Sequence, residues 1–195
     1  MVSIADAGRA DAATAGAIIG RAFADDPVNR WLFGSGPMAP TFTGLARLLY
    51  LPQGFVDLTS DGRGAAMWMP DSRNKDLGAI RTLRLAAAMA ASAGIGAVRR
   101  GLALADCFAE AAPRQRHAYL FAIGVVPDAQ GKGLGGALLR HGLARIDRLQ
   151  RPAYLESTKL ENLPLYRHFG FEDRPILNGP DGCPPIYPMW REARP

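Results

Sequence analysis

The clearest pattern of hydrophobic positions lies in the second half of the chain. Residues 118–126 are nine consecutive apolar positions that include β-branched and aromatic side chains, which is typical of a strand buried on both faces. Pro127 ends this strand, and a helix with one apolar stripe follows a glycine-rich turn. The stripe consists of Leu138, Leu139, Leu143, Ile146 and Leu149, and the other faces carry Arg140, His141, Arg145 and Arg148. We expect this helix to cover a sheet that contains the strand.

Three further elements are expected after this helix. Residues 152–157 form a strand, residues 162–169 a short helix and residues 186–191 a last strand. Asn162 is a good start for the helix because its side chain can cap free N–H groups, and Pro164 in the first turn costs no helical hydrogen bond. The strand at 152–157 therefore brings a carboxylate near its end close to the N-terminus of a helix.

The first half predicts shorter elements with less regular patterns. A helix that begins near residue 11 ends near Asp25, because the residue before Pro27 is driven out of the α region. The expected elements are helices at 11–23 and 41–50, a hairpin of strands at 54–59 and 64–69, and one or two helices from 76 to about 108. Pro113 ends the helical region.

Length and composition suit a single domain over residues 1–195, with 48% apolar and 21% charged residues. The net charge of +5 favours acidic small molecules, but the sequence lacks the dense Lys/Arg stripe of a nucleic-acid binder. The longest apolar stretch, residues 85–98, is too short to span a bilayer, and the N-terminus lacks the core of a signal peptide. We expect a small-molecule partner and neither a nucleic acid nor a membrane.

The two cysteines, Cys107 and Cys183, lie far apart and belong to no Cys-x-x-Cys pair. They indicate neither a disulfide scaffold nor a structural zinc site, so no metal is expected. Reduced cysteines and the lack of an export signal favour a cytoplasmic protein.

The glycine-rich turn is the first candidate for ligand chemistry. Successive backbone N–H groups and the helix dipole suit such a turn to a pyrophosphate, and a lysine in it adds a positive charge. The turn consists of Gln130, Gly131, Lys132, Gly133, Leu134, Gly135 and Gly136. A left-handed turn that serves packing alone would use the same glycines.

A dinucleotide-binding fold is an alternative interpretation of this turn. Gly131, Gly133 and Gly136 have the spacing of that fingerprint, and Glu156 follows twenty residues after the last of them. In that fold the first glycine follows the strand almost directly and further strand–helix units come after it. Here residues 127–130 intervene and fewer than sixty residues remain, so we reject a dehydrogenase.

A better likeness covers residues 120–136, which contain Ile-Gly-Val-x-Pro followed by Gln-Gly-x-Gly-x-Gly. This run resembles the acetyl-coenzyme A signature of the GNAT N-acetyltransferase superfamily. Residues 153–158 and 162–171 are similar to the fifth strand and the tyrosine-bearing helix of that superfamily. Within it, residues 22–27 and 65–70 resemble the branch of puromycin N-acetyltransferase and its relatives.

The resemblance implies the GNAT fold, an α/β arrangement with a mixed, twisted sheet of about six or seven strands flanked by helices. The sheet would splay between the strands at 118–126 and 152–157. The resemblance also implies acetyl-coenzyme A as co-substrate and direct attack of an amine on the thioester, with no acyl-enzyme. A small-molecule primary amine is the expected acceptor, in a monomer or homodimer. Acetylation of protein lysines or N-termini and a non-catalytic coenzyme A sensor are the alternatives.

The same resemblance assigns roles to individual residues. Tyr166 matches the tyrosine that protonates the departing thiolate, and residues 130–136 would bind the pyrophosphate. Asn162 lies four residues before Tyr166 instead of the more common seven, so it is a helix cap first and a cofactor contact second. The backbone expected to pair with the pantetheine arm and to hold the thioester carbonyl is that of Ile123, Gly124 and Val125.

Glu156 is the candidate for the group that accepts the amine proton, although a carboxylate at a strand end also suits an ion pair or a backbone contact. Acceptor specificity is expected from aromatic and acidic residues of the first half. These are Phe23, Asp25, Asp26, Trp31, Phe33, Tyr50 and Trp68. An aromatic core and a helix-ending Asp–Pro pair would explain the same residues. The remaining titratable candidates, expected to be solvated, are His117, His141 and His168.

Overall fold

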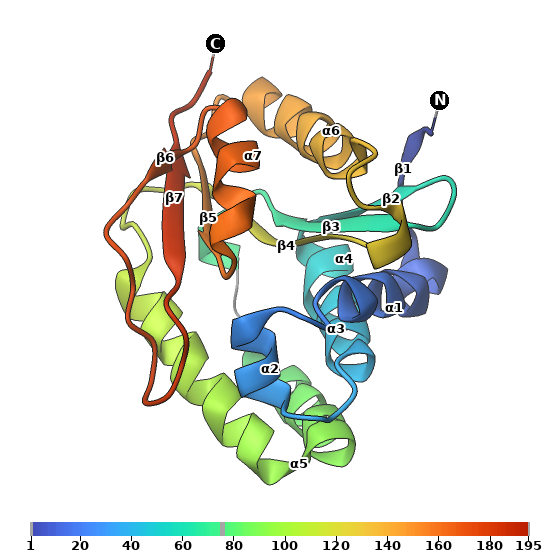
Figure 1. Ribbon diagram of the computed structural model, residues 1–195, viewed down its shortest axis with the longest axis vertical. Coiled ribbons are helices and arrows are strands. Elements are labelled where there is room, and N and C mark those ends of the chain that lie inside the picture. The colour runs from blue at the N-terminus through green and yellow to red at the C-terminus, as the bar shows by residue number, and fades with distance from the viewer. Residues whose placement is uncertain (1, 75–76, 195) are drawn as a thin grey trace.

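The computed structural model describes residues 2–74 and 77–194, which form one seven-stranded sheet with helices on both faces (Figure 1). The strand order is β1-β2-β3-β4-β5-β7-β6, and every neighbouring pair is antiparallel except β4 and β5, which are parallel. The strands are β1 (Ile4–Asp6), β2 (Phe55–Thr59), β3 (Gly64–Met69), β4 (Ala118–Val125), β5 (Ala153–Ser157), β6 (Glu172–Asp173) and β7 (Tyr187–Arg191). This is the mixed sheet that the sequence predicts.

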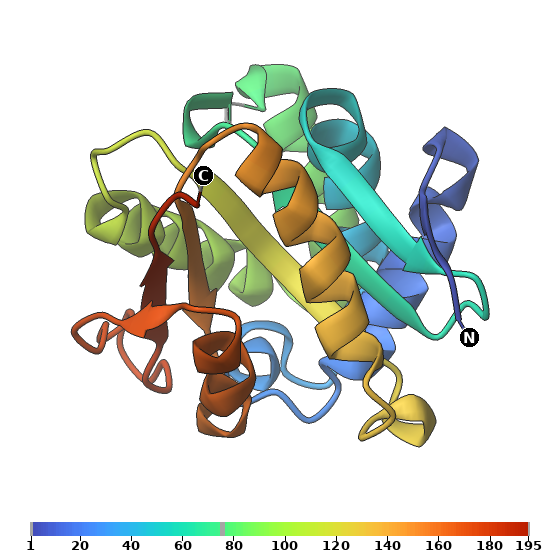
Figure 2. The same ribbon diagram turned by 90° about the horizontal axis from the view of Figure 1, so that it is seen from above.

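Helices cover the two faces of the sheet unequally. One face carries α6 (Leu134–Arg148), which crosses the sheet in Figure 2, and the other carries α1 (Ala12–Ala22) and α3 (Ala39–Leu45). The remaining helices are α2 (Pro27–Phe33), α4 (Leu51–Gln53), α5 (Gly78–Ala111) and α7 (Leu163–His168), with a π-helical turn at Ala46–Tyr50. The long α5 is inserted between β3 and β4 and lies at the bottom of the view in Figure 1.

Each face has its own hydrophobic core because side chains alternate along the strands. Ala66 and Trp68 of β3 pack with Leu138 and Leu139 of α6, whereas Met67 packs on the opposite face with α1 and α3. All five of these side chains are fully buried. Burial of one large apolar side chain contributes about 1.5–3 kcal/mol, so the apolar stripe of α6 is a main support of the sheet.

The two parallel strands β4 and β5 separate soon after they begin. They pair only over Ala118–Leu120 and Ala153–Leu155, although both strands continue further. In the pairing of β4 with β3, Met67 faces Ala122 and Trp68 faces Leu120, so Phe121 is an extra residue. Such a bulge bends a strand and increases its twist. The splay expected between these two strands is therefore confirmed, and a bulge marks where it starts.

Several sequence-based boundaries need correction. The helix from residue 11 ends at Ala22, and Pro27 begins α2 instead of only ending the helix before it. Leu149 was expected in the apolar stripe of α6, but it follows the last helical residue and is 51% exposed. The short strands β1 and β6 were not predicted.

The helical region after β3 divides into two helices, one of the two arrangements expected for it. Gly94 has φ +83° and ψ +165°, which are not helical values, so α5 consists of two helices that meet at a kink. Residue 76, where this region was expected to begin, lies outside the described residues.

Candidate active site

A cavity of about 500 Å³ lies where β4 and β5 separate. Its wall at the sheet comes from residues 119–123 of β4 and from residues 155–158 at the end of β5. Asn162 and Tyr166 close it on the side of α7. The cavity then continues between α2, α3 and α5, where its wall consists mainly of Phe33, Phe42, Leu85, Met89, Val98, Leu104 and Phe108.

Tyr166 lies on α7 with its side chain 6% exposed and its ring edge-on to Phe171. Burial raises the pKa of its phenol well above the usual value, and the negative charge of Asp26 raises it further. The phenol therefore keeps its proton at neutral pH. A protonated hydroxyl in the wall of a cavity is suited to donate that proton to a leaving group.

Glu156 lies on the opposite side of the separated strands. Side chains alternate along β5, so Tyr154 and Glu156 point toward the face of α1, whereas Leu155 points toward α6. Burial raises the pKa of the phenols of Tyr119 and Tyr154, and the charge and hydrogen bonding of Glu156 raise both further. Glu156 therefore interacts with two phenols and also lines the cavity.

The glycine-rich turn connects the end of β4 to α6. Gly131 and Gly133 have φ values of +74° and +80°, which only glycine adopts without strain, and a side chain at either position would point into open space. The first N–H groups of α6, which follow Gly133, have no acceptor within the helix. The turn therefore has the backbone and the open surface that a diphosphate needs.

The two polar side chains of this turn fold back onto the chain. Gln130 Nε2 donates to the carbonyl of Val125 at 3.0 Å, and Lys132 Nζ donates to the carbonyl of Asp128 at 2.9 Å. Both side chains stay exposed, so the lysine charge remains beside the turn. Leu134 is buried in the core, which leaves its backbone as the part that can contact a ligand.

Gly135 and Gly136 bring the first turn of α6 close to α7. A Cβ at either position would meet Leu165 or Phe169 only at ordinary contact distance, 3.6 Å or more. Packing of α7 therefore does not by itself require both glycines.

The segment expected to pair with the pantetheine arm continues past the last pairing of β4 with β5. Beyond Leu120, β4 continues along β3 after its pairing with β5 has ended, and its residues 121–123 line the cavity. An extended ligand can pair with a strand edge as an added strand. Gly124 has a second role, because a Cβ there would lie 2.6 Å from the Cβ of Ala22 on α1. The glycine lets α1 approach the sheet.

Only some of the residues expected to bind the acceptor line the cavity. Phe23 and Phe33 line the cavity, and Tyr50 is buried with its ring stacked on Phe121. Trp68 does not line the cavity, because β3 directs it to the other face, where it is fully buried under α6. Trp31 packs in a separate small core near Leu104.

Asp25 and Asp26 anchor helix α2 to the end of β5. Asp26 is 2% exposed and caps α2 by accepting a hydrogen bond from the Asn29 N–H at 2.8 Å. It also accepts a hydrogen bond from Thr158 Oγ1, and Asp25 pairs with Lys159 at 2.6 Å. These contacts fix one wall of the cavity to the strand that carries the catalytic candidate.

Two other expectations about polar residues change. Asn162 is exposed and lines the cavity, but its side chain makes no capping hydrogen bond to α7. His117 was expected to be solvated, yet it is 1% exposed, with Nδ1 2.7 Å from the carbonyl of Gln115. His141 and His168 are partly or fully exposed as expected.

Sequence reasoning did not identify α5 as a wall of the cavity. Apolar residues spaced three or four apart within the expected helical region, such as Leu85 and Met89, were a possible signal. The partner of Asp26 just after β5, Thr158, gave no local signal, because it lies 132 residues away in the sequence.

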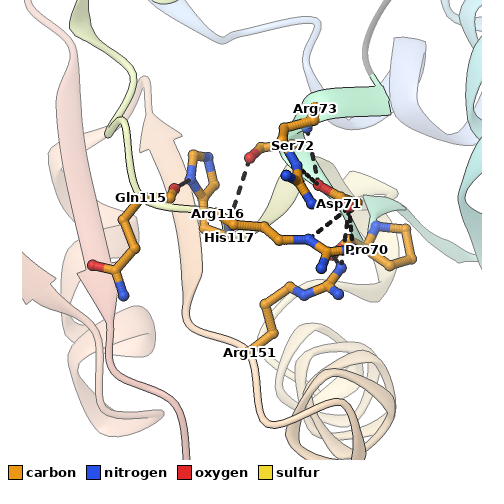
Figure 3. A network of polar contacts seen from close by, with 8 residues as sticks. All are labelled: Pro70, Asp71, Ser72, Arg73, Gln115, Arg116, His117 and Arg151. Atoms are coloured by element: carbon orange, nitrogen blue, oxygen red, sulfur yellow. Dashed lines mark hydrogen bonds and ion pairs between the residues drawn. The ribbon is translucent and has the colours of Figure 1, made fainter.

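The inserted helix α5 is held at its root by a cluster of ions around Asp71 (Figure 3). Asp71 accepts a hydrogen bond from Arg116 Nε at 2.7 Å and pairs with Arg73 and Arg151. The guanidinium of Arg116 holds the pKa of Asp71 well below its usual range. The backbone N–H of Ser72 also donates to the carbonyl of His117 at 2.8 Å, so both ends of the insertion are joined.

Within the described residues, one group could ligate a metal, formed by Asp6, Asp57 and His141 at the edge of β1 and β2. Asp57 is fully buried, and burial raises the pKa of its carboxyl to about 7. Arg145 pairs with both aspartates and so already supplies a positive charge there. None of these residues lines the cavity. In the part of the chain that the structure describes, no helix is long and apolar enough to cross a membrane.

Part of this chain resembles a known family of enzymes in sequence. The sequence profile described as an acetyltransferase (GNAT) domain matches residues 86–173. An uncharacterized N-acetyltransferase of Schizosaccharomyces pombe is 43% identical over 53 residues, which are 27% of this chain. That match spans about a fifth of the yeast protein, 22% of its length.

Solved structures resemble the whole chain. A structure from Corynebacterium glutamicum, described as histone acetyltransferase HPA2 and related acetyltransferase, is 25% identical with a TM-score of 0.72, covering 100% of this chain and 98% of its own. A polyamine N-acetyltransferase of Drosophila melanogaster, which forms N-acetylagmatine, is 14% identical with a TM-score of 0.64, covering 98% and 100%.

A GNAT family acetyltransferase from Brucella melitensis, solved in complex with acetyl-CoA, is 17% identical with a TM-score of 0.55. The alignment covers 100% of this chain and 90% of the Brucella chain. The last two likenesses are likenesses of fold. The chain as a whole therefore has the fold of these acetyltransferase structures, and its residues 86–173 resemble the GNAT acetyltransferase domain.

Proposed function

We propose that this protein transfers the acetyl group of acetyl-coenzyme A to the primary amine of a small molecule. The observation that carries the proposal is the cavity between the separated strands β4 and β5, which Tyr166 and Glu156 line from the two sides of the sheet. The structural neighbour in complex with acetyl-CoA and the neighbour that acetylates an amine support it.

The thioester substrate fits the chain at two places. The N–H groups at the start of α6, with Gly131 and Gly133 before them, would bind the diphosphate, and Lys132 adds a charge. The edge of β4 that does not pair with β3, from Ile123 to Val125, would pair with the pantetheine arm. This arrangement would place the acetyl group in the cavity, where Tyr166 and Glu156 lie.

The transfer is direct in this proposal. The neutral amine attacks the carbonyl carbon, the C–S bond breaks and an amide forms. Tyr166 gives its proton to the departing thiolate, and Glu156 accepts the proton lost by the amine, directly or through water. The protonated phenol and the half-buried carboxylate suit these opposite roles.

The size and burial of the cavity favour a small-molecule acceptor. A volume of about 500 Å³ is within the range of pockets that enclose drug-sized ligands. A small-molecule acceptor also fits the resemblance to the puromycin N-acetyltransferase branch. That this protein belongs to that branch is part of the proposal. A cytoplasmic location also belongs to the proposal and is consistent with two free cysteines.

The test is release of coenzyme A thiol over a panel of small amines, histone and ribosomal peptides. We expect turnover with small primary amines above that with every peptide. Faster acetylation of peptides would favour a protein acetyltransferase. Coenzyme A binding by calorimetry without any turnover would favour a sensor.

A further inference from the structure

The charge of the cavity wall sets a limit on what the acceptor can be. Among the described residues that line the cavity, Glu156 carries the only carboxylate. The part of this wall that residues 2–74 and 77–194 supply contains no lysine, arginine or histidine, and its other polar groups are amides, hydroxyls and phenols. Glu156 itself lies at the sheet end, beside the position proposed for the reacting amine.

The rest of the wall is apolar over the part that extends away from the sheet. Phe23 contacts Phe42 edge-on with ring centres 5.6 Å apart, and Phe42 contacts Phe121 at 6.3 Å. On the opposite side, Met89 and Leu104 of α5 are each 7% exposed. A ligand body in this part of the cavity meets aromatic rings and aliphatic chains.

A second charge on the acceptor would therefore lack a partner. Moving a charged group from water into apolar surroundings without a counter-ion costs several kcal/mol. A diamine would place its second ammonium among the apolar side chains of α5 and α3, and an amino acid would place its carboxylate there.

We infer that the acceptor is a monoamine with an apolar body and no second charged group, which rests on the proposed function for the reaction itself. The structure thus separates this protein from its structural neighbour that acts on polyamines. The carboxylate of Glu156 would pair with the single ammonium of the acceptor, and the apolar side chains of the cavity would surround its apolar body.

Three eight-carbon amines test this inference because they differ in one terminal group. These are octylamine, 1,8-diaminooctane and 8-aminooctanoic acid. We expect kcat/KM for octylamine to exceed that of each charged analogue by roughly tenfold or more, since the second charge must be desolvated or left in solvent. Equal or higher kcat/KM for the diamine or the amino acid would overturn the inference.

One cavity residue allows the charge to be changed with little risk to folding. Leu102 lines the cavity but is 54% exposed, so a polar side chain there needs little desolvation. We expect Leu102→Glu to raise kcat/KM for 1,8-diaminooctane about three- to tenfold relative to Leu102→Gln, and the gain to shrink in 0.5 M salt. No difference between the two variants would count against the inference.

Measuring how tightly the amines bind tests the monoamine specificity separately from the acetyl transfer. Calorimetry with coenzyme A present measures the affinity of the same three amines whether or not they are acetylated. Tighter binding of octylamine without acetylation would sustain the monoamine specificity and remove the acetyltransferase proposal. Equal affinities, or no binding of octylamine, would overturn the specificity even if other amines are acetylated.

Discussion

Tyr166 combines burial with a nearby negative charge, and both keep its phenol protonated. We expect Tyr166→Phe to lower turnover by roughly ten- to a thousandfold, because the thiolate then leaves without a proton donor. The affinity for coenzyme A should stay within about twofold of the original, since the hydroxyl acts on the reacting sulfur. Thiol release and calorimetry measure the two quantities.

A matched control is Tyr187→Phe, because Tyr187 is half-buried on β7 and does not line the cavity. It should leave turnover unchanged. Full activity of Tyr166→Phe would instead assign Tyr166 to packing against Phe171.

Glu156 lies near the phenols of Tyr119 and Tyr154, and its negative charge adds to the effect of burial in raising the pKa of both. We expect Glu156→Gln to lower turnover less than Tyr166→Phe does. The loss should shrink as the pH approaches the pKa of the amine, because an amine that is already neutral in solution need not be deprotonated before it attacks. A pH–rate profile of both proteins measures this, and a loss that is constant with pH would contradict it.

The exposed Glu161 on the next turn of the chain provides the control for this change. Glu161→Gln removes the same charge outside the cavity and should leave the profile unaltered.

At the level of elements, the turn before α6 depends on its glycines for shape. We expect Gly133→Asp to weaken coenzyme A binding by at least about tenfold, because the left-handed backbone is strained and the carboxylate repels the diphosphate. Gly133→Ala introduces the same strain without charge and should weaken binding less. Calorimetry compares both variants with the original, and unchanged binding in Gly133→Asp would place the diphosphate elsewhere.

The elements that were predicted correctly are those with a strong local pattern. β4 and α6 follow from nine apolar positions and from a stripe at helical spacing. The sequence analysis did not predict α2, because an Asp–Pro pair can end one helix or begin the next. Asp26 and Pro27 here follow the end of α1 and also begin α2. β1 and β6 have three and two residues, too few to show any alternation.

The candidate site was predictable where it depends on local sequence and not where it depends on tertiary contacts. The turn, Glu156 and Tyr166 belong to motifs that can be found along the chain, and the last two line the cavity. Trp68 was wrongly expected to line the cavity. The alternation along a strand shows that successive side chains face opposite sides of the sheet, but it does not show which side holds the cavity.

At the scale of the whole molecule, Asp71 joins the two ends of the insertion that carries α5. We expect Asp71→Asn to lower the free energy of unfolding at pH 7 by about 1–3 kcal/mol, because Arg116 loses a largely buried partner. The folded pKa of Asp71 is depressed, so its contribution is complete above the unfolded pKa of about 3.9 and is lost as the pH falls below it. Urea unfolding at pH 7 and at pH 2.5 measures both values.

The difference in the free energy of unfolding between the original protein and Asp71→Asn should therefore become smaller at low pH. An equal difference at both pH values would mean that the charge of Asp71 is not what stabilises the fold. Asp173→Asn removes a surface aspartate of a half-exposed pair with Arg167 and should change the stability by less than about 1 kcal/mol.

Asp71 and Arg116 hold the two ends of the insertion together beside the sheet, although Met89 and Val98 of α5 also pack in the core on that side of the sheet. Residues 78–111 supply the part of the cavity wall that lies away from the sheet. The glycine-rich turn and the separated strands β4 and β5 lie outside this segment. If the proposed function is correct, exchange of residues 78–111 should change the choice of amine and leave the proposed thioester site in place. A chimera that carries the corresponding segment of a relative between the same two anchors should inherit the donor of this protein and the acceptor of the other.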